Sequence, residues 1–365
     1  MTRGHVFGLD LIRALAVAMV LFTHASFLFV PVVRDLAVFD PWWLPGQLGV
    51  ELFFVLSGFL IGGILAAEAE AGDLDVKQFW IRRWLRTLPN YYLFLVLNLA
   101  LERYATGVWP HAWSYAVFAQ NLAWPNPPFY PESWSLAIEE IFYLVAPLLI
   151  LLARGRLARF MRPIPLIVLG ILVFTAIRVG YVLHGNPDWD AGVRKVTLVR
   201  LDAIAYGVLA IVVYRKFPMS LRTSAAIAIA GLVGTAFCVW VCLAWQRDTS
   251  FFARTFLFNL IPLSFAAFLP IAAQWKRSGL PRFAELAVTK LALWSYALYV
   301  SHLGLLRLLL GTFGWKGSTA LECLAQALAF AAMAIAFAAV VYRLYERPLL
   351  QLRDRIAPKT APAVA

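Results

Sequence analysis

The chain has 365 residues, of which 62% are hydrophobic and only 14% are charged, and its mean hydropathy is +0.75. Soluble domains carry about a quarter charged residues, so this composition excludes an ordinary soluble protein. The hydrophobic residues lie in separate runs that lack the two-residue period of barrel strands, and many runs can cross a hydrocarbon core of about 30 Å as a helix. We therefore predict an all-α polytopic membrane protein with about ten transmembrane helices.

The predicted spans are residues 8–30, 46–66, 82–104, 134–153, 163–183, 197–214, 223–245, 254–274, 286–311 and 320–344. The first contains Arg13 and His24, and no small-residue cleavage site follows it before Pro31, so we expect a membrane span and not a cleaved signal peptide. We expect residues 1–350 to form a single transmembrane domain. Residues 351–365 are predicted to be a short, disordered cytoplasmic tail.

The basic residues are distributed unevenly between the two sides of these spans. With the N-terminus inside, the cytoplasmic segments hold roughly three times as many Lys and Arg residues as the opposite side. This bias predicts that both termini are cytoplasmic, and we expect an integral protein of a bacterial inner membrane. The net charge of +12 then reflects topology, and no nucleic-acid partner is expected. The three cysteines lie in apolar spans without metal-ligand spacing, so no metal site is expected.

The longest segment predicted on the outer side, residues 105–133, is rich in Trp and Pro. Trp favours the headgroup level of a membrane, and Pro interrupts helices. We interpret the segment as an interfacial or re-entrant cap, with a plain ordered loop as the alternative.

Two ionisable residues of the first span are candidates for a functional site, because charges inside a membrane span are costly. Arg13 and His24 are eleven residues apart, which is close to three helical turns, so they share a face and are separated by about 16 Å along the axis. The alternatives are an arginine that extends to the interface and a histidine that is satisfied by packing.

Other spans place polar residues at a similar depth in the outer half of the membrane. Glu51 lies near the outer end of the second span, and Trp134 and Ser135 open the fourth span ahead of Glu139. A shared face of the ninth span carries Tyr296, Tyr299 and His302. Arg200 and Asp202, at the start of the sixth span, are a potential ion pair. The sequence therefore predicts a polar pocket at one level, formed by His24, Glu139, Arg200, Asp202 and His302.

A basic cluster occupies the cytoplasmic start of the third span. Arg82, Arg83 and Arg86 are spaced three and four residues apart and so form one patch on a helix. The patch is either a topological anchor or site for anionic lipid head groups, or a clamp for the phosphates of a nucleotide-like carrier.

Several segments occur in a characteristic order along the chain: Gly8–Ala14 with His24, Leu48–Leu60, Arg82–Arg86, Trp134–Glu140, Arg200–Ala203, Ser295–Tyr299 with His302, and Tyr342–Pro348. Together they resemble the acyltransferase-3 family of integral membrane acyltransferases. The resemblance implies transfer of an acyl group, usually acetyl, from acyl-CoA to a hydroxyl group. It implies a surface polysaccharide, a glycolipid precursor or a secondary metabolite as the acceptor, and a functional role for Arg82, Arg83, Arg86, Arg13 and His24.

Some members of that family carry a fused soluble hydrolase-like domain, which does not follow Pro348 in this sequence. We therefore expect the chain to work alone or with separate envelope-polysaccharide assembly proteins. The expected partners are acyl-CoA as donor, a carbohydrate or lipid-linked glycan as acceptor, and membrane lipids.

The residues and the resemblance suggest one layout for the reaction. We expect the basic cluster to hold the anionic end of CoA and the arm of the carrier to pass Arg13 toward His24. His24 is the expected general base, and Glu139 is expected to fix its tautomer. Tyr299 or His302 is expected to stabilise the oxyanion. An acyl-enzyme route remains open, and residues expected to contact substrate are Glu51, Trp134, Ser135, Arg200, Asp202, Tyr299 and His302.

Two other classes of function compete with this reading. A transporter of a small organic anion or sugar also suits ten spans with buried charges, but the sequence shows neither paired halves nor interrupted helices in matching positions. A non-catalytic scaffold for envelope assembly leaves the alignment of Arg13 and His24 unexplained.

Overall fold

The computed structural model describes residues 6–33, 40–72, 74–154 and 162–358. Within these ranges every regular element is helical, which confirms the predicted all-α class. Four short elements, labelled η, have 3-10 or π geometry. The elements are α1 Phe7–Ser26, η1 Phe27–Phe29, α2 Asp40–Ala71, α3 Val76–Thr106, α4 Trp113–Ala116, α5 Ser133–Arg154, α6 Pro163–Gly185, η4 Trp189–Arg194, η5 Thr197–Val199, α7 Asp202–Lys216, α8 Leu221–Ala244, α9 Phe251–Arg254, α10 Leu257–Ala266, α11 Leu269–Gln274, α12 Arg282–Phe313, α13 Ala320–Val341, η6 Tyr342–Glu346 and α14 Arg347–Ile356.

Nine helical segments of the described residues are long and apolar enough to cross a membrane. They are Phe7–Phe29, Pro41–Ala71, Ser133–Leu151, Pro163–Gly185, Thr197–Lys216, Leu221–Ala244, Leu257–Gln274, Arg282–Phe313 and Ala320–Ile356. The third predicted span, 82–104, lies in α3 and is not among these nine. This helix has 31 residues, but charged residues of its first half and polar residues such as Asn90 and Asn98 lower its hydropathy.

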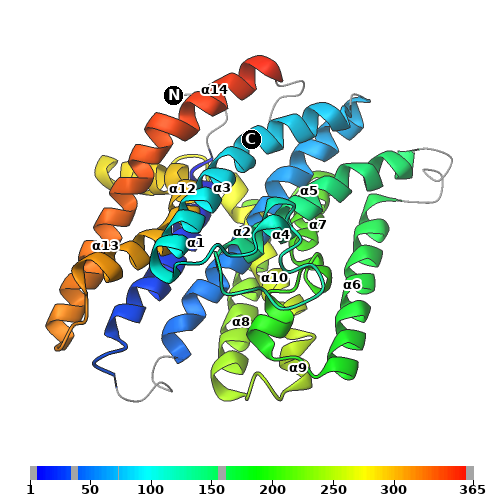
Figure 1. Cartoon of the computed structure of the whole chain (residues 1–365). Coiled ribbons are helices and arrows are strands. Elements are labelled where there is room, and N and C mark those ends of the chain that lie inside the picture. The colour runs from blue at the N-terminus through cyan, green and yellow to red at the C-terminus, as the bar shows by residue number, and fades with distance from the viewer. Residues whose placement is uncertain (1–5, 34–39, 73, 155–161, 359–365) are drawn as a thin grey trace.

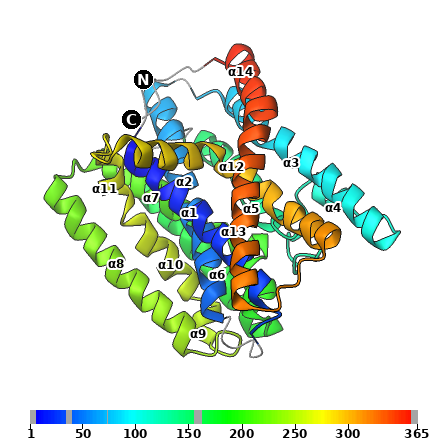
Figure 2. The same cartoon turned by 90° about the vertical axis from the view of Figure 1, so that its left-hand side faces the viewer.

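The centre of the protein is a bundle in which α1 packs against α2 and α12, and α2 packs against α7 (Figures 1 and 2). The contact between α2 and α7 depends on two glycines. A Cβ atom on Gly58 would lie 2.0 Å from the carbonyl oxygen of Ile204, and one on Gly207 would lie 1.9 Å from that of Val55. Small residues let membrane helices approach this closely, so these glycines fix how near α7 lies to the helix that lines the candidate site.

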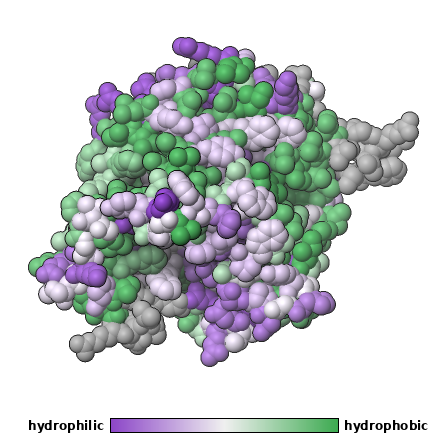
Figure 3. Space-filling model, in the orientation of Figure 1, coloured by the Kyte–Doolittle hydropathy of each residue, from purple (hydrophilic) through white to green (hydrophobic). Residues whose placement is uncertain are grey.

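The surface of this bundle matches a membrane environment. Figure 3 shows hydrophobic residues over both flanks of the molecule and hydrophilic residues gathered at the top and in the lower middle. Many large apolar side chains of the outer helices are exposed, including Leu172 at 59%, Leu232 at 61% and Leu328 at 63%. Hydrocarbon, not water, is the environment that accommodates such a surface.

The eighth predicted span, 254–274, is divided between two helices. Most of its residues lie in α10 and α11, and Ala267 and Phe268 join these helices in a turn. Pro262 lies inside α10 and Pro270 lies at the start of α11, and proline removes a backbone donor that a continuous helix needs.

The segment 105–133 is an ordered cap that contains one helical turn, α4. Its polar residues hold it against neighbouring elements: Asn121 donates from Nδ2 to the carbonyl oxygens of Trp134 at 3.0 Å and Lys195 at 2.6 Å. The backbone N–H of Thr197 donates back to the carbonyl oxygen of Asn121 at 2.8 Å. Trp109 and Trp113 remain exposed. The cap therefore packs over the starts of α5 and η5.

The last helix, α14, extends the chain beyond the domain end expected at residue 350. It follows α13 and η6 directly and lies against α3 (Figure 1). Residues 351–356 are helical, and residues 359–365 of the predicted disordered tail lie outside the described residues. As a result, the C-terminal helix contacts the helix that carries the basic cluster.

Candidate active site

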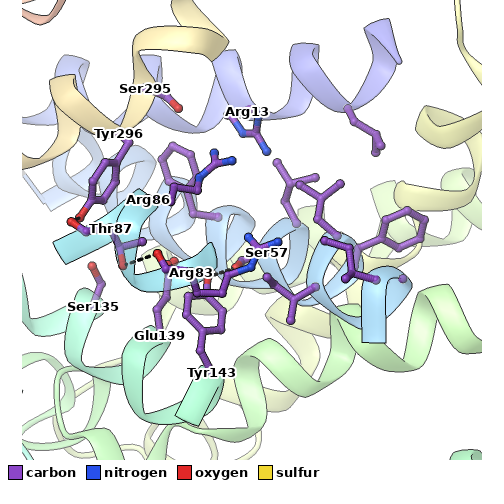
Figure 4. A pocket seen from close by; sticks show the side chains of 18 of the residues that line it. Arg13, Ser57, Arg83, Arg86, Thr87, Ser135, Glu139, Tyr143, Ser295 and Tyr296 are labelled. Atoms are coloured by element: carbon purple, nitrogen blue, oxygen red, sulfur yellow. Dashed lines mark hydrogen bonds between the residues drawn. The ribbon is translucent and has the colours of Figure 1, made fainter. Parts of the chain in front are cut away.

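A cavity of about 340 Å³ lies between α1, α2, α3, α5 and α12, and residues of α7 and α11 complete its lining. Small-molecule sites range from about 300 to 1000 Å³, so the cavity has room for a slender ligand. Figure 4 shows the charged and polar side chains that project into it from different helices. Figure 4 labels Arg13, Ser57, Arg83, Arg86, Thr87, Ser135, Glu139, Tyr143, Ser295 and Tyr296, and the lining also includes Tyr214 and Tyr299.

Three arginines give the cavity its positive charge. Arg13 comes from α1, and Arg83 and Arg86 come from successive turns of α3, as expected for residues three apart (Figure 4). The Nε atom of Arg83 is buried and has no hydrogen-bond partner in the described part of the chain. Arg13 lies 4.0 Å from Asp10, one turn earlier in α1. The structure thus brings together three of the four arginines assigned to donor binding.

The fourth arginine, Arg82, lies outside the lining of the cavity and contacts the C-terminal helix. Its guanidinium group lies 3.1 Å from a carboxylate oxygen of Asp354 and donates to the carbonyl oxygen of Ala357. Because Arg82 and Arg83 are consecutive in a helix, they point in directions about 100° apart. Arg82 therefore attaches α14 to α3, while Arg83 faces the cavity.

The carboxylate of Glu139 lies in the cavity within a chain of hydroxyl groups. Tyr143, one turn later in α5, donates to it at 2.9 Å, and the Tyr143 hydroxyl also contacts Ser57 of α2. Arg13, Arg83 and Arg86 line the same cavity. Glu139 therefore balances part of the charge of the three arginines.

The hydroxyl groups of Ser135 and Tyr299 meet at another part of the lining. Their oxygens are 2.6 Å apart, and Tyr299 also lies 3.2 Å from the carbonyl oxygen of Glu132. The Glu132 side chain is buried, and neither carboxylate oxygen has a partner within the described residues. Burial raises the pKa of Glu132 to about 8. This buried acid just before α5 is one that the sequence did not single out.

Two histidines adjoin this hydroxyl pair. The Nδ1 atom of His302 lies 2.8 Å from the carbonyl oxygen of Tyr299 and 3.1 Å from that of Leu298, and its Nε2 atom lies 2.9 Å from the Nδ1 atom of His24. Carbonyl oxygens only accept, so the neutral His302 ring carries its hydrogen on Nδ1 and accepts at Nε2. His24 must then donate from Nδ1, so its Nε2 atom, for which the described residues provide no hydrogen-bond partner, can accept a proton.

The predicted contact between Glu139 and His24 is wrong. The Nδ1 atom of His24 is within 2.9 Å of the Val20 carbonyl oxygen and of His302, whereas Glu139 pairs with Tyr143. Equal depth in the membrane sets the level of a residue but not the direction in which it points. The partner of His24 comes from α12, and the histidine pair lies next to the cavity without lining it.

The expected ion pair between Arg200 and Asp202 is also wrong. Arg200 donates to both carboxylate oxygens of Glu51, at 2.8 and 2.6 Å, and Asp202 lies 2.8 Å from Arg178 of α6. All four side chains are buried. These pairs join α2 and α6 to the start of α7 and do not line the cavity, so Glu51, Arg200 and Asp202 have the position of structural residues.

Trp134 is buried and also lies outside the lining. The guanidinium group of Arg194 lies over its ring, 4.6 Å from the ring centre. This stacking joins the start of α5 to η4.

Sequence inspection missed several lining residues. Tyr143 follows Glu139 by four residues, a spacing that could have indicated their contact. No sequence pattern indicated Ser57 and Thr87 in the same way, because the residues near them in α2 and α3 do not show which other helices they will face. Thr87 is reached from α12 by Tyr296, whose hydroxyl donates to the Thr87 carbonyl oxygen at 2.7 Å.

Comparison with known protein families now identifies the chain. The acyltransferase-3 family, described as an acyltransferase domain, matches residues 6–343. Among individual proteins, the peptidoglycan O-acetyltransferase OatA of Listeria monocytogenes is 33% identical over 169 residues, 41% of this chain and 25% of that protein. A Staphylococcus aureus protein provisionally named an O-acetyltransferase is 28% identical over 238 residues, 58% of this chain and 35% of that protein.

The alignments therefore span only about a quarter to a third of these relatives' own length. No solved structure matches the chain. The family match nevertheless covers nearly all of the helical bundle, including every residue that lines the cavity. The chain belongs to the acyltransferase-3 family of acyltransferase domains, and its apolar helices are those of a membrane protein.

Proposed function

We propose that this enzyme transfers an acetyl group from acyl-CoA to a hydroxyl group of a carbohydrate or glycolipid acceptor, one destined for an exported polysaccharide. The observation that carries the proposal is the arrangement of Arg13, Arg83 and Arg86 in one cavity with the His24–His302 pair beside it. A cationic cavity suits an anionic donor, and a neutral imidazole suits activation of a hydroxyl.

The size of the cavity suggests that different parts of the donor bind at different places. At about 340 Å³ it is near the lower limit for ligand sites, so it suits the slender acyl-pantetheine arm better than a whole nucleotide. The phosphates of the donor would remain with Arg83 and Arg86, and Arg13 would contact the arm. In this reading, Arg82 contributes by holding α14 in place and not by touching the donor.

The chemistry follows from the free Nε2 atom of His24. As the acceptor oxygen attacks the thioester carbonyl carbon, its proton passes to this nitrogen, and a C–O bond forms. The tetrahedral oxyanion would receive hydrogen bonds from Tyr299 or Ser135, the hydroxyl pair between the cavity and the histidines. Collapse breaks the C–S bond, and the departing CoA thiolate recovers the proton from His24.

In this mechanism His302 is a positioning residue for His24. Together with the Val20 carbonyl oxygen, it accepts the Nδ1 hydrogen of His24 and so fixes the tautomer. It also stabilises the imidazolium ion that forms, as a carboxylate does in hydrolase triads. Glu139 is proposed to orient Arg13 and Arg86 around the donor and is no longer placed behind His24.

The acceptor class rests on the relatives. OatA is named a peptidoglycan O-acetyltransferase, so a glycan hydroxyl is the acceptor that the comparison favours. We further propose that the enzyme lies in a bacterial inner membrane, with its donor site on the cytoplasmic side, and that it acts together with proteins of envelope-polysaccharide assembly.

The proposal is tested by mass spectrometry of envelope glycans and glycolipids from three strains: one with the gene, one without it, and one carrying His24→Ala. We expect one class of glycan to lose an acetyl unit in both altered strains. Membranes supplied with acetyl-CoA labelled in the acetyl group should pass the label to the same glycan. Unchanged acetyl content in the deletion strain would rule out the proposed acceptor class.

A further inference from the structure

A second cavity, of about 380 Å³, lies where α12 meets the junction of α13, η6 and α14. We call it the basic groove. It is lined by two residues of α12, two of α13, two of η6 and the first of α14, namely Lys290, Trp294, Ala339, Val340, Tyr342, Arg343 and Arg347. No residue of the basic groove lines the active-site cavity.

Among the described residues, no acidic side chain pairs with the cations of the basic groove. Lys290, Arg343 and Arg347 are exposed, and none makes a hydrogen bond or ion pair with another residue in the described ranges. The acid that lies between the two arginines in sequence, Glu346, is buried and accepts a hydrogen bond from Asn90 of α3 at 2.9 Å. Three positive charges therefore converge on one concave site without an acidic lining residue.

The same groove has an apolar half. Ala339, Val340 and the half-buried Trp294 continue it along the outer surfaces of α12 and α13, where Val340 is 52% exposed and Leu293 is 40% exposed. Both helices belong to predicted membrane spans, so this half faces hydrocarbon. Tryptophan is enriched at the level where hydrocarbon meets head groups, and this places the cations of the groove at that level.

The backbone of the groove is irregular. Residues Tyr342–Glu346 form the π-helical turn η6 between two α-helical segments. Such turns shift the facing direction of the residues that follow and are frequent at functional sites. Arg343, within this turn, and Arg347, just after it, both line the groove, whereas Glu346, the last residue of the turn, is buried.

We propose that the basic groove binds an anionic phospholipid of the surrounding membrane. The phosphate group would lie among Lys290, Arg343 and Arg347, and an acyl chain would lie along Trp294 and Val340. Charge complementarity and the continuity of cationic and apolar surfaces favour a lipid over a soluble anion, because free phosphate would use only the cationic half. Trp294 is followed by Ser295 and Tyr296, which line the active-site cavity, so the lipid would support the turn of α12 that forms the active site.

The test uses the purified full-length protein in detergent, with phosphatidylglycerol and phosphatidylcholine as probes and native mass spectrometry as the readout. The variant is Lys290→Gln/Arg343→Gln/Arg347→Gln. The matched control, Arg222→Gln/Lys276→Gln/Arg282→Gln, removes three other exposed basic residues. We expect phosphatidylglycerol to bind the unaltered protein and the control at least ten-fold more tightly than it binds the variant.

Several outcomes would overturn the proposal. Equal losses in the variant and the control would mean that the basic surface attracts lipid without a site. Equal binding of phosphatidylcholine would exclude recognition of negative charge. Displacement of the lipid by inorganic phosphate at equal concentration would favour a soluble anion. If the triple variant unfolds, the single substitution Arg343→Glu, at an exposed position, replaces it in the test. Unchanged phosphatidylglycerol affinity in that protein would contradict the site.

Discussion

The Nε2 atom of His302 lies 2.9 Å from the Nδ1 atom of His24, and this contact joins α12 to the C-terminal end of α1. The two backbone carbonyl groups that hold the Nδ1 atom of His302 determine the direction of the hydrogen bond. As a result, His302, which the sequence placed at the same level as His24, acts with the Val20 carbonyl oxygen to fix the Nδ1–H tautomer of the proposed general base.

Loss of His302 should therefore lower turnover more than donor binding. We expect His302→Phe to reduce kcat by roughly 100-fold, since general bases contribute about 10²–10⁴ to rate, and to leave KM for acetyl-CoA nearly unchanged. His302→Gln keeps an acceptor and should recover part of the loss. Steady-state kinetics at matched protein amounts measure this effect, with His184→Phe, an exposed histidine, as the control. Full activity in His302→Phe would remove this residue from the mechanism.

The basic residues of α3 should separate into two groups. Arg83→Ala and Arg86→Ala each remove a charge-assisted contact and should weaken acetyl-CoA binding by about 1.5–3 kcal/mol, or roughly 10- to 150-fold. Arg82→Ala should leave donor affinity close to normal, because Arg82 contacts Asp354 and Ala357. Isothermal titration of the purified protein compares the three. A loss of affinity that is largest for Arg82 would contradict the arrangement of the cavity.

The pair of Glu51 and Arg200 should stabilise the fold and not the substrate. Glu51→Gln leaves the buried Arg200 guanidinium without its counter-charge and should cost about 3–5 kcal/mol of unfolding free energy. Glu70→Gln, which removes the exposed partner of Arg215, should cost less than about 1 kcal/mol. Thermal unfolding in detergent distinguishes the two variants. If the Glu51→Gln protein were as stable as the unaltered protein but bound the acceptor more weakly, Glu51 would contact substrate, as the sequence predicted.

Glu132 should make stability depend on pH. Burial raises the pKa of its carboxyl group to about 8 from a usual value near 4.5, so between these values the folded state holds a proton that the unfolded state releases. Stability is then highest below pH 4.5 and falls as pH rises toward 8. We expect Glu132→Gln to flatten this part of the melting-temperature profile. The same slope in Glu132→Gln and in the unaltered protein would show that Glu132 does not hold this proton in the fold.

The orientation predicted from basic residues can be tested with engineered cysteines. A membrane-impermeant thiol reagent applied to intact cells should label Ala123→Cys, in the cap, and should not label Lys77→Cys, at the start of α3. Both positions are exposed, and the native Cys238, Cys242 and Cys323 are buried. The reverse pattern of labelling would invert the topology and place the histidine pair nearer the cytoplasm.

The sequence alone determined the class of the protein and much of its helix content. Span-length apolar runs can satisfy their backbone groups in lipid only as helices, so composition and spacing sufficed. Prediction from the sequence was less reliable for helices that are stabilised mainly by packing against other helices. Charged and polar residues reduce the hydropathy of α3, and the breaks that separate α9, α10 and α11 follow from local backbone geometry that hydrophobicity does not report.

The site was only partly determined in this way. Residues on one helix, such as Arg83 and Arg86, could be placed together because helical spacing fixes their relative direction. Contacts between helices needed the tertiary structure, because depth in the membrane fixes the level of a side chain but leaves its direction open. For that reason only the packed bundle decided that His24 contacts His302, that Glu139 contacts Tyr143, and that Arg200 and Asp202 belong to separate ion pairs.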